Sequence, residues 1–208
     1  MEGLDAGEKV MKELYELPVY RKHLERRGNS QTIMLGFSDG TKDGGYLKAN
    51  WEIYETKEQL TKISDENNIK VIFFDGRGGP PARGGGKTHD FYASQGKTIA
   101  NNKIEITIQG QTITSVFGNK DQAKYNFEQL LTAGIENDVF KNSKKDLTEK
   151  ERNLIQELAE ISFRKYSELK THTMFVPYLQ EMSTLEYYGR TNIGSRPSKR
   201  GGTNELKF

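Results

Sequence analysis

A short polar segment at residues 38–45, SDGTKDGG, carries an acid and a base three residues apart and ends in two glycines. A carboxylate such as that of Asp39 can bind a hard cation such as magnesium through oxygen. A lysine such as Lys42 can approach a phosphate or a developing enolate as a point charge. The alternative is an ordinary solvated turn, because Asp, Gly and Lys are common in loops. The segment is therefore a candidate metal- and anion-binding loop.

A second polar segment, at residues 75–87, reads DGRGGPPARGGGK, and six of the twelve residues from Asp75 to Gly86 are glycine. Glycines let backbone amides face an anion, and the forks of Arg77 and Arg83 match phosphate or carboxylate oxygens. The spacing is not that of a P-loop. A flexible linker is one alternative, although a linker rarely needs two arginines after an apolar run. A Gly/Arg RNA-binding segment is another, but such segments are usually longer, repeated and rich in aromatics.

The C-terminal residues 190–208 are loop-like and basic. Within them, NIGSRPSKRGG at residues 192–202 places Arg196, Lys199 and Arg200 among small residues. This pattern suits a mobile loop that closes over a bound anion. A basic disordered tail is the alternative, because chain ends are often poorly ordered.

Composition restricts the class of protein. The 208 residues suffice for one large domain or two small ones. The 31 basic and 29 acidic residues argue against a dedicated nucleic-acid binder. No cysteine is present, which excludes disulfides and fits the cytoplasm, and neither a long apolar run nor a signal peptide is visible. The hydrophobic content of 34% is low, which suggests that the chain is incomplete.

Two apolar runs, Thr32–Phe37 and Ile69–Phe74, stand directly before the first two polar segments. Their uniform character is typical of strands buried on both faces of a parallel sheet. Residues 46–67 between them have the periodicity of a long helix. The resulting βαβ order places the carboxyl ends of both strands at one edge of the sheet. We therefore expect both polar segments to lie together at that edge.

The rest of the chain is expected to be mostly helical. Residues 103–117 alternate apolar and polar side chains around Gln109-Gly110-Gln111, which predicts a β-hairpin. Further helices are expected over residues 5–15, 19–26, 121–135, 148–170 and 172–182. Thr148 and Glu151 have the spacing of a capping box. The sequence thus predicts a helix-rich α/β fold with one β-hairpin.

Three segments resemble the signatures of the phosphoenolpyruvate carboxylase family: MLGFSDGTKDGGYLKANW at 34–51, FDGRGGPPARGGGKTH at 74–89 and IGSRPSKR at 193–200. Their order and spacing also match, over essentially the whole chain. The resemblance implies a partial TIM-type barrel with extra helices across residues 1–208. It implies a cytoplasmic, homotetrameric, allosteric enzyme that makes oxaloacetate and phosphate from phosphoenolpyruvate and bicarbonate, with magnesium or manganese. No nucleic acid or membrane partner is expected.

The resemblance also implies roles for individual residues. Asp39 would be one of two acidic metal ligands, and Lys42 would lie beside the substrate. Arg77 would hold and polarise the phosphate and the carboxyphosphate. Arg83 would stabilise the site and, in inhibited forms, bind the dicarboxylate effector, aspartate or malate.

In the basic C-terminal segment, Arg196 would contact the phosphate. Lys199 and Arg200 would help to bind substrate as part of the moving lid, residues 199–202.

Two departures from the family pattern bear on these implications. The family usually has histidine where this chain has Asp75, and a carboxylate cannot supply the same donor. The family's catalytic histidine, its second metal carboxylate and a further arginine would lie outside Met1–Phe208. We therefore expect this chain, alone, to be inactive and to need the remainder of the enzyme chain. The alternative is a non-catalytic module that binds phosphate or dicarboxylates.

Overall fold

The computed structural model describes residues 4, 6–77, 86–108, 110–140, 146–184 and 187. In this part of the chain the fold is helix-rich and contains a small parallel sheet with the strand order β1–β2–β3. The strands are β1 (Ser30–Leu35), β2 (Lys70–Asp75) and β3 (Ile104–Ile106). Ser30 pairs with Lys70 at the start of β1, and Leu35 pairs with Asp75 at its end. The expected parallel βαβ arrangement is confirmed.

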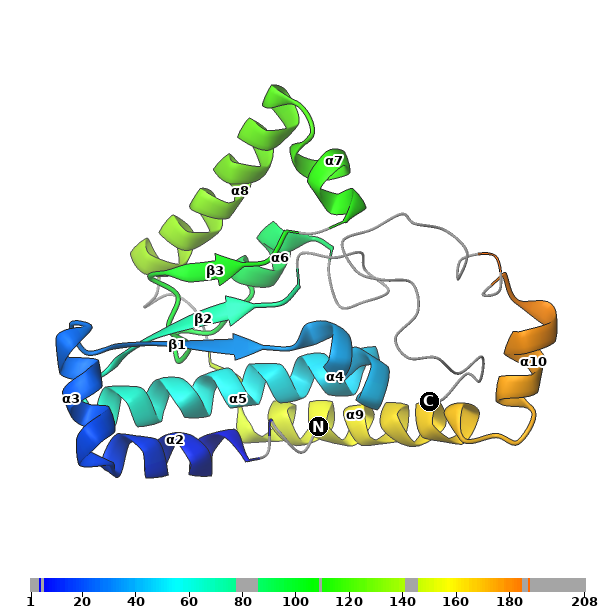
Figure 1. Cartoon of the computed structure of the whole chain (residues 1–208), viewed down its shortest axis with the longest axis horizontal. Coiled ribbons are helices and arrows are strands. Elements are labelled where there is room, and N and C mark those ends of the chain that lie inside the picture. The colour runs from blue at the N-terminus through cyan, green and yellow to red at the C-terminus, as the bar shows by residue number, and fades with distance from the viewer. Residues whose placement is uncertain are drawn as a thin grey trace.

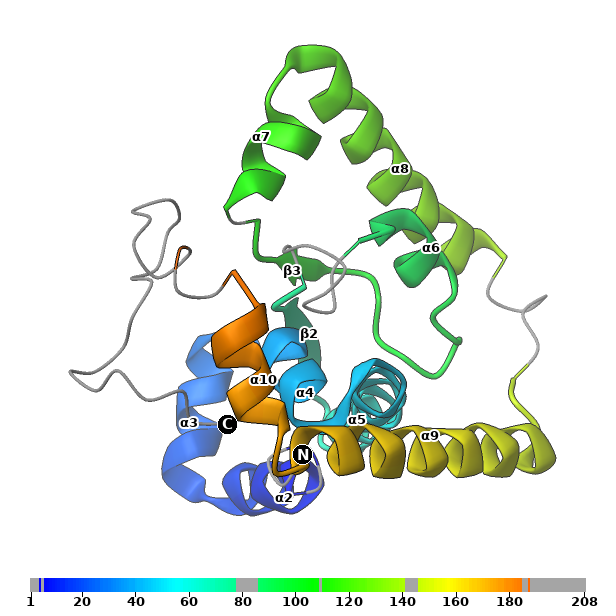
Figure 2. The same cartoon turned by 90° about the vertical axis from the view of Figure 1, so that its right-hand side faces the viewer.

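The helices surround this sheet unevenly. Figure 1 shows α5 along the sheet with α9 and α2 beyond it, whereas α7 and the end of α8 next to it extend away from the sheet. In the view of Figure 2, α5 is seen nearly end-on above α9. The helices are α2 (Gly7–Glu16), α3 (Pro18–Arg26), α4 (Phe37–Gly44), α5 (Tyr46–Glu66), α6 (Thr88–Ala93), α7 (Gln111–Phe117), α8 (Lys120–Val139), α9 (Glu149–Lys170) and α10 (Phe175–Met182).

Helix α5 is the centre of the hydrophobic core. It contacts β2, α2, α4 and α9. Its apolar residues Ile53, Leu60 and Ile63 recur at helical spacing and are buried, so one face of the helix packs against the sheet. Phe73 of β2 and Leu35 of β1 belong to the same cluster. This packing fixes the strand ends relative to α5.

The strands are less deeply buried than their apolar sequences predict. Along β2, Val71 and Phe73 are buried and alternate with the half-buried Ile72 and Phe74. On β1, Met34 is exposed. The prediction of burial on both faces is therefore wrong for the described residues, in which helices cover the sheet mainly on the α5 side.

The first polar segment is a helix rather than the expected loop. Helix α4 includes most of residues 38–45. Phe37, which is fully buried, anchors its start. A β-carbon added at Gly40 would lie 3.5 Å from the Ala49 side chain, so this glycine lets α4 and α5 approach closely. Gly45 has a φ of +77° and separates the two helices.

The predicted β-hairpin at residues 103–117 is wrong. Only Ile104–Ile106 forms a strand, and it pairs in parallel with β2. Gly110, with a φ of +60°, precedes α7. Phe117 of α7 packs on Phe127 of α8, with ring centroids 5.2 Å apart. Packing against α8 thus overrides the local alternation of apolar and polar residues.

Other sequence predictions agree with the structure. Helix α9 begins at the predicted capping box, where the Glu151 amide donates to Thr148 Oγ1 and the Thr148 amide donates to Glu151 Oε2. Within the described residues, no helix is both long enough and apolar enough to cross a membrane. The predicted basic segment 190–208 lies outside the described residues.

Candidate anion-binding site

The carboxyl ends of the strands meet at one edge of the sheet, as expected. Leu35 pairs with Asp75, and Asp75 pairs with Ile106. The Gly76 amide donates to the Leu35 carbonyl at 3.0 Å. A β-carbon at Gly76 would lie 3.0 Å from that oxygen, so a side chain there would crowd this approach. The residues that follow β1 and β2 are thereby brought together.

Arg77 is held in an aromatic cage at this edge. Only 4% of its surface is exposed. Its guanidinium carbon lies 3.9 Å from the ring centroid of Phe91 and 5.7 Å from that of Phe37. Burial lowers the pKa of Arg77, although a guanidinium remains charged at neutral pH.

Two nitrogens of Arg77, Nε and Nη1, are buried and have no hydrogen-bond partner among the described residues. A buried charged donor without a partner is costly. An anionic ligand with two acceptor oxygens would satisfy both nitrogens. Arg77 is therefore the candidate anion-binding residue that the structure supports most strongly.

A buried ion pair lies beside Arg77. Lys57 Nζ is 2.7 Å from Asp75 Oδ2, and both side chains are almost completely buried. The Tyr92 hydroxyl donates to the same oxygen at 2.8 Å. Burial lowers the pKa of Lys57, although Asp75 opposes this effect. Burial raises the pKa of Tyr92, and the Asp75 carboxylate adds to this rise.

Sequence reasoning missed Lys57 and Tyr92. One available signal was that position 57 falls four residues after Ile53 and three before Leu60, on the apolar face of α5. A charge within an apolar stripe requires a buried partner. Tyr92 gave no comparable signal.

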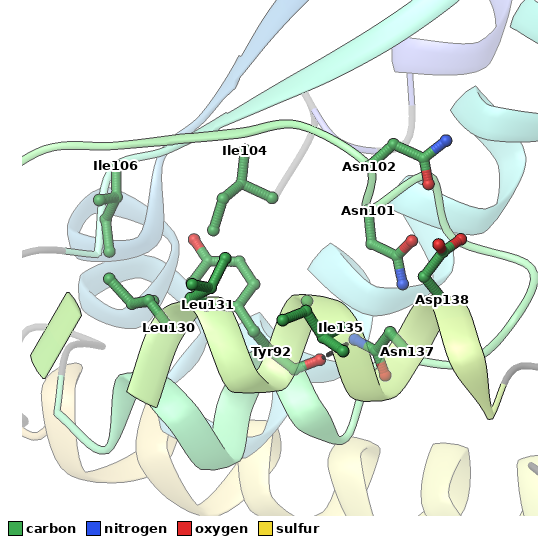
Figure 3. A pocket seen from close by; sticks show the side chains of 11 residues that line it. Tyr92, Asn101, Asn102, Ile104, Ile106, Leu130, Leu131, Ile135, Asn137 and Asp138 are labelled. Atoms are coloured by element: carbon green, nitrogen blue, oxygen red, sulfur yellow. Dashed lines mark hydrogen bonds between the residues drawn. The ribbon is translucent and has the colours of Figure 1, made fainter. Parts of the chain in front are cut away.

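A cavity of about 580 Å³ lies between β3 and α8, and Tyr92 forms part of its wall. Apolar side chains such as Ile104 and Leu131 line most of it (Figure 3). Asn137 of α8 donates from Nδ2 to the Tyr92 carbonyl at 2.6 Å. Helix α6 is thus tied to α8 as well as to β2.

Asp39 and Lys42 lie on α4, the helix whose first residue, Phe37, contacts the Arg77 guanidinium. Asp39 is exposed and, with Asp43, lines a cavity of about 420 Å³ between α2, β1 and α5. The aromatic residues around Arg77 do not line this cavity. Lys42 is also exposed, and its carbonyl accepts a hydrogen bond from the Tyr166 hydroxyl at 2.8 Å. The described structure therefore places these residues at neighbouring strand ends but not in one cavity.

The remaining predicted site residues lie outside the described residues; they are Arg83, Arg196, Lys199 and Arg200.

Two carboxylates on the wall of the cavity between α2, β1 and α5 could contribute to a metal site, Asp39 and Asp43, and Asp39 is the predicted ligand. The described residues contain no cluster of three or more His, Asp or Glu side chains that could hold an ion. The carboxylate of Asp39 on a cavity wall has the oxygen donors that magnesium and manganese prefer. Magnesium is often held by one or two carboxylates together with substrate and water. Asp39 could thus provide one of the ligands of such a site.

Ligands of α/β proteins usually bind at the carboxyl edge of a parallel sheet, which is where Arg77 lies. Residues 1–207 match the family described as phosphoenolpyruvate carboxylase, and the chain belongs to this family. The resemblance found in the three sequence segments is thereby confirmed.

Curated relatives named phosphoenolpyruvate carboxylase are similar to the chain along its whole length. The protein of Corynebacterium efficiens is 36% identical over 208 residues, which cover 100% of this chain and 23% of the relative. A Corynebacterium glutamicum protein is 37% identical over 210 residues, with the same two shares. That of Corynebacterium diphtheriae is 34% identical over 206 residues, 99% of this chain and 23% of the relative. The chain thus spans about a quarter of the length of these relatives.

Proposed function

We propose that this chain carries part of the substrate-binding site of a phosphoenolpyruvate carboxylase. The complete enzyme would be a carboxy-lyase that fixes carbon dioxide, converting phosphoenolpyruvate and bicarbonate to oxaloacetate and phosphate. The observation that carries this proposal is the caged Arg77, whose Nε and Nη1 have no partner among the described residues. Membership of the family supports the same assignment.

The chemistry explains the need for such an arginine. A bicarbonate oxygen attacks the phosphorus of phosphoenolpyruvate, and the bond from phosphorus to the enol oxygen breaks. The products are carboxyphosphate and an enolate, both with concentrated negative charge. Carboxyphosphate then releases carbon dioxide and phosphate, and the enolate carbon attacks the carbon dioxide. A fixed guanidinium stabilises the developing charge, and the rings of Phe91 and Phe37 help to exclude water from it.

The other residue roles rest on the resemblance. Lys42 would add positive charge beside the substrate. Asp39 would hold magnesium or manganese, which would supply further charge stabilisation when bound. Arg83 would stabilise the site and take an aspartate or malate effector.

The basic segment 190–208 would close over the substrate. Three of its residues would contact the substrate at its phosphate end: Arg196, Lys199 and Arg200.

The remainder of the enzyme would complete the fold. Among the described residues, β1 and β3 each pair with β2 only, so each has one side without a neighbouring strand. Strand edges and exposed apolar faces of this kind are usually covered. We infer that the regions of the relatives that this chain does not span supply the other strands of a TIM-type barrel. A cytoplasmic homotetramer is the expected state of the complete enzyme.

Calorimetric titration of phosphoenolpyruvate into the 208-residue chain tests this assignment. Arg77→Ala should weaken binding by about tenfold or more, because a hydrogen bond to a charged group contributes roughly 1.5–3 kcal/mol. Arg164→Ala, at an exposed position on α9, is the matched control and should leave affinity unchanged. Equal affinity of the Arg77→Ala chain would refute the assignment.

A further inference from the structure

We propose that Lys57, Asp75 and Tyr92 form a positioning network that fixes Phe91 beneath the Arg77 guanidinium. The link from this network to substrate binding rests on the proposed function, whereas the contacts that form the network do not. It assigns a role to Asp75, the residue that stands where the family usually has histidine.

The network begins with a buried ion pair that joins α5 to the end of β2. The side chains of Lys57 and Asp75 are 1% and 0% exposed, and Nζ lies 2.7 Å from Oδ2. Removing two charges from water offsets much of their attraction, so a buried ion pair is weak evidence of added stability. A buried ion pair can instead fix one conformation of the groups that it joins. Here it fixes the orientation of the Asp75 carboxylate.

Tyr92 extends the network to α6. Its hydroxyl donates to the same Asp75 oxygen at 2.8 Å, and its carbonyl accepts from Asn137 at 2.6 Å (Figure 3). Helix α6 has only six residues, and so short a helix has little stability of its own. These two contacts therefore fix the position of α6 between β2 and α8.

Phe91 precedes Tyr92 on α6 and takes its position from it. The two rings meet edge to face, with centroids 5.0 Å apart. Phe91 also packs edge to face on Phe37, at 5.5 Å. The guanidinium carbon of Arg77 lies 3.9 Å from the Phe91 centroid, within the range of a cation–π interaction. A displaced α6 would remove this ring from beneath Arg77.

Asp75 thus acts as a positioning residue through its Oδ2, while its Oδ1 is buried without a hydrogen-bond partner among the described residues. Both hydrogen bonds to its Oδ2 come from the protein, one from an ammonium and one from a phenol. The carboxylate orients α6, and α6 orients the side chain that binds the anion. Position 75 therefore acts on the site through Phe91 and Arg77.

The test observes the Arg77 Nε–H signal in nitrogen-15 NMR spectra of the whole 208-residue chain, without ligand. Its loss in Arg77→Lys identifies the signal. In the unmodified chain this proton should exchange slowly with solvent, because the group is buried. Phe91→Leu, which removes the aromatic platform, should speed its exchange about tenfold or more.

Tyr92→Phe is the decisive variant, because it deletes only the oxygen that bonds to Asp75. It should speed Arg77 exchange in the same direction as Phe91→Leu and weaken phosphoenolpyruvate binding. Tyr15→Phe is the matched control, since it removes another buried hydroxyl that bonds to Ser64 in the core. This control should leave the Arg77 signal unchanged.

An unchanged Arg77 exchange rate in Tyr92→Phe would overturn the inference, even if the melting temperature fell. A different pattern would count against the proposed function alone: faster exchange in Tyr92→Phe, with no response of the Arg77 signal to phosphoenolpyruvate in the unmodified chain. If Phe91→Leu does not fold, Tyr92→Phe still decides the question.

Discussion

At the residue scale, the Lys57–Asp75 pair couples the stability of the core to the geometry of the site. Lys57 Nζ also lies 5.1 Å from the centroid of Phe73 and 5.2 Å from that of Phe91. The ammonium therefore depends on one carboxylate and on aromatic faces, at a position that is almost inaccessible to solvent. The nearby Arg77 guanidinium also acts on the pair, because it attracts Asp75 and repels Lys57.

This dependence predicts strongly non-additive mutations. Lys57→Met or Asp75→Asn alone should lower the free energy of unfolding by roughly 3–5 kcal/mol, because each removes one charge of the pair and leaves the other buried without its partner. The double variant should lose much less than the sum, since neither charge remains and asparagine can still accept from Tyr92. Urea unfolding of the four proteins measures the coupling. Additive losses would show that the two side chains act independently.

The pH dependence of stability is a second prediction, and it concerns Tyr92. Burial raises the pKa of this phenol above its ordinary value. The phenol therefore contributes stability that is complete below about pH 10 and is lost as the pH rises further. The lowered pKa of Lys57 has the opposite effect, a loss of stability as the pH falls below about 10.5. Lys57 is present in both the unmodified chain and Tyr92→Phe, so this effect cancels when the two are compared.

The measurement is the difference in unfolding free energy between the unmodified chain and Tyr92→Phe across pH. This difference should be constant from about pH 7 to pH 9 and should shrink above about pH 10. A difference that remains constant to about pH 11 would contradict the raised pKa.

Sequence reasoning found Arg77 but not the residues that hold it. Arginine among glycines after an apolar run is a local pattern, visible in a few consecutive residues. The Lys57–Asp75–Tyr92 contacts join positions 17 or more residues apart. Such contacts depend on how α5 and α6 pack on β2, which no local spacing encodes. Asp75, which departs from the family pattern, accordingly had no expected role.

At the element scale, the βαβ unit was predictable because two apolar runs flank a helix-periodic segment. Helix α4 was not, because its glycine-rich sequence has low helix propensity and forms a helix through the burial of Phe37 and contact with α5. The false hairpin has a related cause. Alternation over residues 103–117 is a local signal, whereas the contact of α7 with α8 is tertiary.

The junction of α4 and α5 yields the prediction at this scale. Gly45 has a φ of +77° and a ψ of 169°, a region that is essentially restricted to glycine. A β-carbon there would also lie 3.2 Å from the Tyr166 ring. Gly45→Ala should therefore lower the free energy of unfolding by roughly 1–3 kcal/mol.

Gly134→Ala is the matched control for this substitution. Gly134 lies within α8, and a β-carbon there would meet no atom within 4 Å. Alanine should stabilise this helix by roughly 0.5–1 kcal/mol. Urea midpoints compare the two variants, and an equal response would exclude backbone strain at Gly45.

At the scale of the whole molecule, α8 presents an apolar stripe that the described residues leave largely exposed. Phe127, Leu131, Ile135 and Val139 recur every four residues and are 61%, 65%, 52% and 65% exposed. A stripe of this kind is typical of a surface that packs against another part of a protein. Since the chain spans 23% of its relatives, we infer that the remaining part of the enzyme covers it.

A chimera tests this inference. In it, the chain replaces the matching region of the Corynebacterium efficiens relative, which is similar to it over 208 residues. Leu131→Glu should lower the melting temperature of the chimera, because burying a leucine contributes roughly 1.5–3 kcal/mol. It should leave the isolated chain almost unaffected, as should Lys124→Glu, a control at another exposed position of α8. A chimera indifferent to Leu131→Glu would show that the stripe stays exposed.

The same chimera provides the most direct measurement of the central claim, that Arg77 binds the reacting anion of a phosphoenolpyruvate carboxylase. Oxaloacetate formation should require both phosphoenolpyruvate and bicarbonate. Arg77→Ala should reduce its rate about a hundredfold or more, as for the loss of one charge-stabilising donor in a closed site. A folded chimera that forms no oxaloacetate, or an Arg77→Ala chimera with an undiminished rate, would contradict the claim.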